Sequence, residues 1–239
     1  MRDGAVHTGI RAKLALENPF DTYVHDPARV DKQGWNSRHG FFETVIAAAQ
    51  PKLVIELGVW KGMSAIHMAG LMQAQGIDGE VLAIDTFLGS SAHLSTPGRR
   101  AELLPKDGYP TLYQTFLANV HDAGMQDRIV PLPMDGNSAA YALARLGVKA
   151  DLIHIDASHE YESCLADLRN YWPLLADDGI LLADDYGTWP GVTRAVCQFC
   201  AEVDRPLFGT MAKAIVPKGP NQGFVMRAVK EKSYRRGAA

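Results

Sequence analysis

The sequence predicts one doubly wound α/β domain, with a mostly parallel sheet that is covered by helices on both faces. Three observations lead to this prediction: five short apolar runs, helical patterns between them, and glycine or acidic residues where the runs end. Nearly continuous apolar runs are typical of parallel strands that are buried on both faces. The length of 239 residues fits one such domain with a few additions.

The five expected strands consist almost entirely of Ile, Leu, Val and Ala. They span residues 53–58, 81–85, 128–132, 151–156 and 179–184. The expected helices that alternate with them span about 62–75, 110–124, 137–146, 160–175 and 190–203. Two more strands are expected near the C-terminus, at about 207–216 and 222–229, on either side of a turn rich in Pro and Gly. Because this connection is too short for a crossover helix, the last two of the seven strands should form an antiparallel hairpin at the sheet edge.

Three further segments complete the expected domain organisation. Residues 1–50 should form an N-terminal helical cap whose last helix spans about 38–50, residues 51–230 the main domain, and residues 231–239 a flexible tail. Residues 87–110, rich in Gly, Ser and Pro, follow the second strand directly. A loop this long at the carboxyl end of a strand is interpreted as a lid or substrate loop; the alternative is a plain surface excursion.

The composition excludes several classes of protein. A formal charge of −3 gives no electrostatic footprint for nucleic acid, and no apolar stretch is long enough to cross a membrane. The N-terminus lacks the apolar core of a secretory signal. Three cysteines do not form a disulfide framework in a chain of this length. Cys197 and Cys200 are interpreted as buried structural residues rather than a redox or zinc pair, so a reducing, cytoplasmic compartment is expected.

A candidate cofactor loop follows the first strand, in the run from Val54 to Ser64. Gly58 and Gly62 would let the backbone approach a ligand closely, although a purely structural turn would also explain them. Their G-x-x-x-G spacing differs from the dinucleotide fingerprint. Glu56 would repel a pyrophosphate but suits a ligand that carries an ammonium and a sulfonium group.

Two later strand ends extend this candidate site. Asp85, followed by Thr86, ends the second strand, where a carboxylate can accept hydrogen bonds from two ribose hydroxyls or can instead cap a helix. The turn from Asp135 to Ser138 follows the third strand, where Ser138 could contact the ligand or serve as a helix N-cap. The coincidence of these groups at successive strand ends is more specific than any one of them.

Three carboxylates mark the candidate chemical site. Asp156 ends the fourth strand, and Asp184 and Asp185 end the fifth. Clustered carboxylates repel one another, and a divalent cation with oxygen ligands, such as Mg²⁺, would resolve the conflict. Neighbouring strand residues point to opposite faces, so Asp184 and Asp185 can both reach a cation only if the chain turns there. The alternative is that one of them caps a helix or bonds a backbone amide. His159 could accept a proton from a substrate hydroxyl; the alternative is a helix-capping role.

Several other residues that attract notice are interpreted as packing residues. They are His67, His154, Tyr161, Leu165, Leu168, Leu175, Trp35, Phe41 and Phe42. Trp35, Phe41 and Phe42 could instead line a substrate pocket.

These motifs resemble those of class I S-adenosylmethionine-dependent methyltransferases, of the metal-dependent type that methylates hydroxyls of sugars and natural products. The resemblance covers roughly residues 38–230 and depends on E-x-G-x-x-x-G-x-S and on I-D-x-x-H-x-Y…D-L…W-x-P-L-L…G…D-D-Y. The second block resembles the macrolide and aminocoumarin sugar methyltransferases. The resemblance implies magnesium on Asp156, Asp184 and Asp185, with a base at or near His159. Asp178-Gly179 replaces the family's usual Gly-Gly, which changes a turn and not the chemistry.

The expected function is therefore methyl transfer from S-adenosylmethionine to a hydroxyl of a small molecule. The expected cofactor ligands are Glu56, Gly58, Gly62, Ser64, Asp85, Thr86, Asp135, Ser138 and Asp156. A nicotinamide-dependent oxidoreductase and a non-catalytic S-adenosylmethionine-binding domain are the alternatives. The sequence does not identify the acceptor, and a homodimer through the N-terminal helices is a further expectation.

Overall fold

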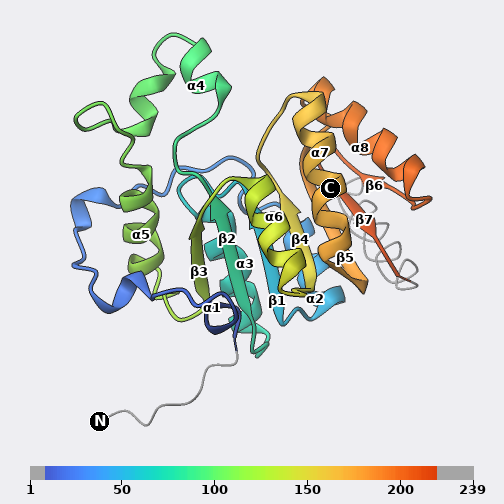
Figure 1. Cartoon of the computed structure of the whole chain (residues 1–239), viewed down its shortest axis with the longest axis horizontal. Coiled ribbons are helices and arrows are strands. Elements are labelled where there is room, and N and C mark those ends of the chain that lie inside the picture. The colour runs from blue at the N-terminus through green and yellow to red at the C-terminus, as the bar shows by residue number, and fades with distance from the viewer. Residues whose placement is uncertain (1–8, 220–239) are drawn as a thin grey trace, which may run out of the picture.

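The computed structural model describes residues 9–219, which form a mixed sheet between two layers of helices (Figure 1). The strand order is β3-β2-β1-β4-β5-β7-β6. The strands are β1 Leu53–Leu57, β2 Glu80–Asp85, β3 Ile129–Pro133, β4 Ala150–Ile155, β5 Leu175–Tyr186, β6 Phe208–Gly209 and β7 Ala212–Pro217. The first five are parallel, and β7 runs antiparallel to both β5 and β6. The predicted fold class is therefore confirmed.

The helices connect the strands where the apolar periodicity predicts them. The α-helices are α1 Ile10–Lys13, α2 Phe41–Ala49, α3 Met63–Ala74, α4 Ser91–Ser95, α5 Leu112–Asp122, α6 Gly136–Arg145, α7 Tyr161–Tyr171 and α8 Pro190–Glu202. Four short 3-10 helices are η1 Pro19–Asp21, η2 Pro27–Arg29, η3 Arg99–Leu103 and η4 Trp172–Leu174. No helix within residues 9–219 is long and apolar enough to cross a membrane.

Alternate residues of the strands pack against different helices, which gives the sheet two separate cores. On one face, side chains such as Ile55 and Ile153 pack against α6, α7 and α8. On the other face, their neighbours Val54 and Leu152 pack against α2, α3 and α5. This alternation follows from the two-residue period of a strand. It explains why the runs read as continuously apolar, because both faces are buried.

Within the described residues, an antiparallel hairpin lies inside the segment that was predicted as a single strand. The expected strand at 207–216 is interrupted after Gly209, where the N–H of Thr210 donates to the carbonyl of Lys213 at 3.0 Å and closes a tight turn. The two arms are β6 and β7, so the prediction of one continuous strand here was wrong. The expected strand at 222–229 lies outside the described residues. The antiparallel arrangement itself is present.

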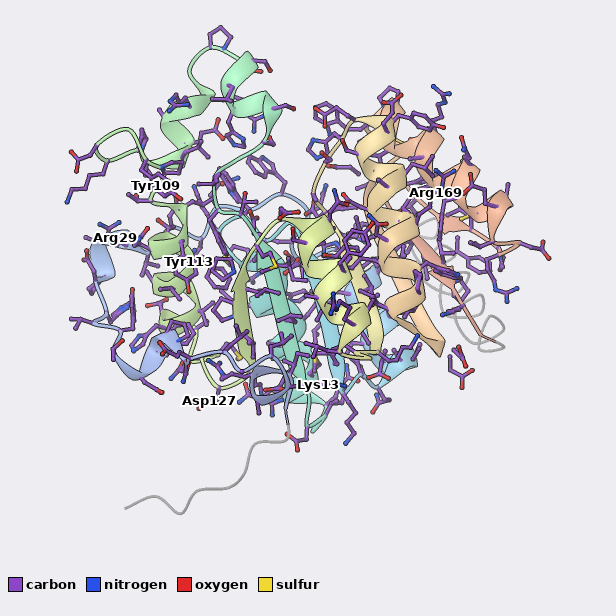
Figure 2. The ribbon with its side chains drawn as sticks, viewed as in Figure 1. Lys13, Arg29, Tyr109, Tyr113, Asp127 and Arg169 are labelled. Carbon is purple, nitrogen blue, oxygen red and sulfur yellow. The ribbon has the colours of Figure 1, made fainter. Side chains whose placement is uncertain are left out.

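Two segments outside the strand–helix alternation lie at the periphery of the sheet. Residues 14–40 contain only the turns η1 and η2, each of which begins with a proline after an Asn or Asp cap, rather than a full helical layer. Residues 87–110 contain α4 and η3 and project beyond the carboxyl ends of the strands (Figure 1). Figure 2 shows Tyr109 of this segment far from Lys13 and Asp127, which lie at the opposite pole of the molecule.

The cysteines of the C-x-x-C pair lie on α8 and face different environments. Cys200 is buried, as predicted, but Cys197 is exposed, so the prediction that both are buried was wrong. Residues three apart on a helix do not point in identical directions, and Cys197 lies at the boundary of the apolar stripe. Both thiols are free.

Candidate active site

A cavity of about 1130 Å³ opens where the parallel strands end at their carboxyl termini. This is the crevice in which open α/β sheets bind their ligands. Most of the residues that the sequence singled out line it together. These are Gly58, Asp85, Thr86, Asp135, Asp156, His159, Asp184 and Asp185. Residues 87–110 contribute Ser90, Ser91, His93 and Arg99 to the wall of the cavity.

Four predicted cofactor residues do not line this cavity. Glu56 is fully buried and is directed at His154 instead of a ligand. Gly62 has a φ of +87°, and a Cβ there would lie 2.8 Å from the ring of Phe116, so tight packing explains this glycine. Ser64 is buried within α3. Ser138 is not the N-cap of α6, because its backbone N–H donates to the side chain of the N-cap residue, Asp135.

The loop after β1 forms one edge of the cavity, here called the loop edge (residues 58–60 with Asp85). Gly58 has a φ of +82°, and a Cβ there would lie 1.9 Å from the carbonyl oxygen of Asp156, so no other residue fits. The carboxylate of Asp85 accepts three backbone hydrogen bonds, from Val59 at 2.8 Å, Trp60 at 3.0 Å and Phe87 at 2.7 Å. A carboxylate offers about four acceptor sites. Asp85 therefore organises the loop and keeps one site for a ligand hydroxyl.

The turn after β3 adds a third element beside the loop edge. The side chain of Asp135 accepts from the backbone N–H of Ser138 at 2.9 Å and so caps α6. These hydrogen bonds hold the pKa of Asp135 below its ordinary value. The turn thus presents Gly136 and Asn137 to the cavity at a helix N-terminus.

The opposite edge of the cavity, here called the acidic edge, consists of Asp156, Asp184 and Asp185. The register of β5 against β7 shifts between Asp184 and Tyr186, and Asp185 has a φ of +58°. The chain therefore turns at this point, which brings both carboxylates toward Asp156. Donor atoms of Asp156 and Asp184 with His154, and of Asp156 and Asp185 with His159, lie within 4.8 Å of one another.

The carboxylates of the acidic edge do not ionise equally easily. Burial raises the pKa of Asp156 well above its ordinary value, and the negative charge of Asp184 raises it further. Burial also opposes ionisation of Asp184, but its contacts with His154 and Lys213 hold its pKa below the ordinary range. The charge of Lys213 partly offsets these effects on Asp156, but Asp156 itself has no ion pair within the described residues.

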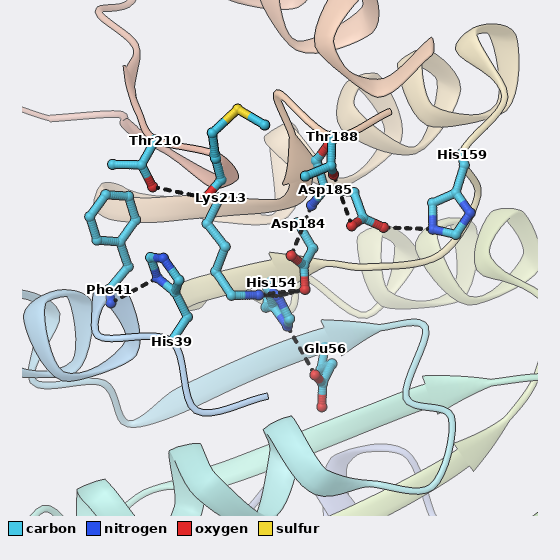
Figure 3. A network of polar contacts seen from close by, with 11 residues as sticks. His39, Phe41, Glu56, His154, His159, Asp184, Asp185, Thr188, Thr210 and Lys213 are labelled. Carbon is cyan, nitrogen blue, oxygen red and sulfur yellow. Dashed lines mark hydrogen bonds and ion pairs between the residues drawn. The ribbon is translucent and has the colours of Figure 1, made fainter. Parts of the chain in front are cut away.

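His159 stands at the mouth of this edge, just before α7. Its Nε2 lies 2.8 Å from Oδ2 of Asp185 (Figure 3). Its ring stacks on Trp189 with centroids 4.4 Å apart. Because a carboxylate can only accept, Nε2 carries the proton and Nδ1 is left as the basic nitrogen. Two contacts therefore fix the orientation of the imidazole.

A chain of buried polar groups lies beneath the acidic edge (Figure 3). Lys213 of β7 contacts Oδ2 of Asp184, and its Nζ lies 3.4 Å from Nε2 of His154. Nδ1 of His154 lies 2.9 Å from Oε1 of Glu56. Because a carboxylate can only accept, Nδ1 of His154 donates to Glu56, while its Nε2 lies between Lys213 and Asp184.

Three residues of this region were not predicted as site residues. Lys213 had a detectable signal, since it is a lysine within an otherwise apolar strand. His154 was interpreted as structural, yet it contacts both Glu56 and the acidic edge. Trp189 had no signal, because its stack on His159 forms only through the tertiary fold.

The residues of the acidic edge fit a divalent cation. Donor atoms of Asp156 lie within 4.8 Å of those of Asp184 and His154 and, in a second group, of Asp185 and His159; most of these donors are carboxylate oxygens, and the half-buried Asp156 has no ion pair within residues 9–219. A hard cation with oxygen ligands would compensate the excess negative charge.

Comparison with known proteins identifies the family. A family model described as a methyltransferase domain matches residues 55–186, which is more than half of the chain and includes both edges of the cavity. The chain belongs to this methyltransferase family. The match confirms the resemblance that the motifs E-x-G-x-x-x-G-x-S and D-D-Y predicted.

Individual relatives of this methyltransferase are distant. The chain is 29% identical over 154 residues to the 8-demethyl-8-(2,3-dimethoxy-alpha-L-rhamnosyl)-tetracenomycin-C 4'-O-methyltransferase of Streptomyces olivaceus. That alignment covers 60% of this chain and 56% of the relative, so the chain matches little more than half of the relative's length.

Solved structures share the fold of this methyltransferase. The O-methyltransferase NovP superposes with a TM-score of 0.59 and 20% identity, over 77% of this chain and 80% of NovP. An O-methyltransferase from Bacillus cereus in complex with SAH gives a TM-score of 0.54 and 14% identity, over 87% and 88% of the two chains. At these identities the likeness concerns the arrangement of strands and helices.

Proposed function

We propose that this protein is an S-adenosylmethionine-dependent O-methyltransferase that acts on a hydroxyl of a small molecule. The observation that supports this most directly is the single cavity that joins the loop edge to the acidic edge. The first edge suits an adenosyl cofactor, and the second suits a hydroxylated acceptor. The family of the chain and the bound SAH in a structural neighbour point to the same cofactor.

The cofactor would lie along the loop edge. Gly58 allows the closest approach, because its backbone has no side chain to block a ligand. The remaining acceptor site of Asp85 would bind a ribose hydroxyl, and Thr86 lines the cavity beside it. The turn at Asp135 to Asn137 would contact the adenine. The reactive methyl group would then face the acidic edge.

The acceptor hydroxyl would lie at the acidic edge, with Mg²⁺ held by Asp156, Asp184 and Asp185. A bound Mg²⁺ would orient this hydroxyl and lower its pKa. His159 would take the proton on Nδ1, while Asp185 holds the other ring nitrogen. The hydroxyl oxygen forms the new bond to the methyl carbon, and the electron pair of the broken bond stays on sulfur to give S-adenosylhomocysteine. Positioning the two reactants in one cavity supplies much of the rate.

The proposed acceptor is a sugar or another ring-bearing natural product. The Streptomyces olivaceus relative is named as a 4'-O-methyltransferase of a rhamnosyl-tetracenomycin. In this chain Trp35 and Trp189 line the cavity and are 55% and 43% exposed, so they offer apolar surface to a ring. Apolar walls with a few fixed polar groups are typical of small-molecule sites.

The proposal can be tested with a panel of glycosylated and phenolic acceptors. The protein is incubated with S-adenosylmethionine and each acceptor, and the products are analysed by mass spectrometry. We expect a singly methylated product that disappears with excess chelator and returns with Mg²⁺. Full activity in chelator would contradict the role of the cation. Tight cofactor binding without any methylated product would favour a non-catalytic binding domain.

A further inference from the structure

Lys213 is a cation in the interior of the protein. Its side chain is fully buried, and its register partner across the antiparallel pair is Asp184. Besides its contacts with Asp184 and His154, its Nζ lies 4.6 Å from the ring centroid of Phe42 in α2. Fully buried lysines are rare unless they are paired, because removing an ammonium from water is costly. The position of Lys213 therefore requires the carboxylate of Asp184.

The carboxylates of the acidic edge in turn depend on Lys213, because this edge carries more negative charge than its surroundings compensate. His159 faces Asp185, and Lys213 faces Asp184. Asp156 has no ion pair within residues 9–219, although it lies beside both other carboxylates. Lys213 is thus the fixed positive charge that allows three carboxylates to remain together before a cation binds.

Lys213 also fixes the geometry of Asp184. Oδ2 of Asp184 accepts from Lys213, and Oδ1 accepts from the backbone N–H of Asp185 at 2.8 Å. Each oxygen of Asp184 therefore already accepts one hydrogen bond, and its remaining lone pair is left for a ligand in the cavity. Because a carboxylate that is already neutralised attracts a cation less strongly, the same contact lowers the affinity of the centre.

We propose that Lys213 is a positioning residue of the acidic edge: it stabilises the cation-free protein and limits how tightly the centre holds a divalent cation. The second part rests on the proposed cation in the function described above. The first part depends only on Lys213 and the carboxylates. A centre of this kind is folded before the cation arrives and exchanges it readily.

The test compares Lys213→Met, which keeps the length of the side chain but removes the charge, with Lys52→Met as a matched control. Lys52 is exposed and lies at the start of β1, at the opposite end of the sheet. A third protein, Asp184→Asn with Lys213→Met, removes both members of the pair. Thermal unfolding is measured after dialysis against chelator, and cation affinity is measured by titration with MnCl₂ followed by electron paramagnetic resonance, with MgCl₂ as competitor.

In the cation-free state, Lys213→Met should unfold roughly 5–10 °C lower than the wild type, because one buried charge is left unpaired. The double variant should recover most of this loss, since it has no unpaired partner. Lys52→Met should unfold like the wild type. In the Mn²⁺ titration, Lys213→Met should bind about tenfold more tightly than the wild type. Added Mg²⁺ should also raise its unfolding temperature more than that of the wild type.

Two results would overturn the proposal. One is a Lys213→Met variant whose unfolding temperature and Mn²⁺ affinity equal those of Lys52→Met. The other is a loss of folding in Lys213→Met that neither Mg²⁺ nor the second substitution Asp184→Asn restores, because Lys213 would then act only by packing.

These results are separable from a failure of the proposed function. If the wild type binds neither Mn²⁺ nor Mg²⁺, the proposed cation is wrong, and so is the limit that Lys213 sets on its affinity. The unfolding temperatures without cation still decide whether Lys213 stabilises the acidic edge.

Discussion

The two edges of the cavity use carboxylates in opposite ways. At the loop edge, the carboxylate of Asp85 is surrounded by three backbone N–H groups that are already in place. At the acidic edge, Asp156 faces other carboxylates, and the buried cation Lys213 contacts Asp184 instead. The first edge is stable without a ligand. The second edge brings several carboxylates close together, and a bound divalent cation would compensate their negative charge.

This difference predicts that the same kind of substitution has opposite effects on stability at the two edges. A hydrogen-bonded carboxylate stabilises the folded state, whereas a buried carboxylate beside like charges destabilises it. Function, in contrast, should suffer at both edges.

Asp156→Asn should abolish methyl transfer while leaving the protein at least as stable as the wild type. The amide removes a cation ligand, so we expect turnover to fall by about a thousandfold or more. The substitution also replaces a carboxyl group whose pKa is raised by burial and by the charge of Asp184. Unfolding in chelator should therefore occur at the same or a higher temperature. Turnover and thermal unfolding check the two halves. A strongly destabilised variant would show that repulsion between Asp156 and the neighbouring carboxylates does not destabilise the folded protein.

Asp85→Asn should destabilise the protein and weaken cofactor binding. The amide keeps one acceptor oxygen but places an NH₂ group against backbone N–H groups, which we expect to cost about 2–4 kcal/mol of unfolding free energy. The affinity for S-adenosylhomocysteine should fall at least about tenfold. Urea unfolding and calorimetry measure the two effects. Unchanged stability would show that the loop does not depend on Asp85.

Asp167 tests what happens to a carboxylate with neither kind of partner. It lines the cavity from α7, no hydrogen bond or ion pair to its side chain is found within residues 9–219, and burial raises its pKa to about 7. An unfolded aspartate titrates near 3.8. Stability that Asp167 contributes is therefore fully present below about pH 4 and is lost as the pH rises to about 7, because only the unfolded chain releases its proton readily there.

Asp167→Asn should remove this dependence. Relative to the wild type, the variant should gain about 2–4 kcal/mol of unfolding free energy between pH 4 and pH 8. Urea unfolding at the two pH values measures the gain. Equal differences at both pH values would mean that the carboxylate has an ordinary pKa.

Trp189→Ala should have the smallest effect. The substitution removes the ring that stacks on His159 but leaves the contact with Asp185, so the imidazole loses one of its two constraints. A stacked aromatic pair contributes about 0.5–1.5 kcal/mol. We expect kcat to fall roughly threefold to tenfold at unchanged cofactor affinity. An unaltered kcat would indicate that Asp185 alone orients His159.

The contrast between the edges also explains which features could be predicted from the sequence. The apolar runs predict β1 to β5 because strands that are buried on both faces consist of consecutive apolar residues. Asp85, Asp156, Asp184 and Asp185 could be found because they end strands, and the carboxyl ends of parallel strands meet at one edge of a sheet.

What the sequence did not show depends on contacts between distant segments. Glu56 also follows the strand pattern, but the side chain of a strand residue can point to either face, and here it points to His154 rather than into the cavity. Lys213 pairs with Asp184 only because β7 inserts beside β5. The turn that separates β6 from β7 contains no glycine or proline at Thr210 and Met211, so no local signal marks it.

The most direct test of the central claim is calorimetric titration of the wild type with S-adenosylmethionine and S-adenosylhomocysteine, with and without Mg²⁺. If the loop edge is a preassembled cofactor site, both ligands should bind at one site per chain with micromolar affinity, and S-adenosylhomocysteine should bind equally well in chelator. Absence of binding by either ligand under both conditions would contradict the proposed cofactor and the function built on it.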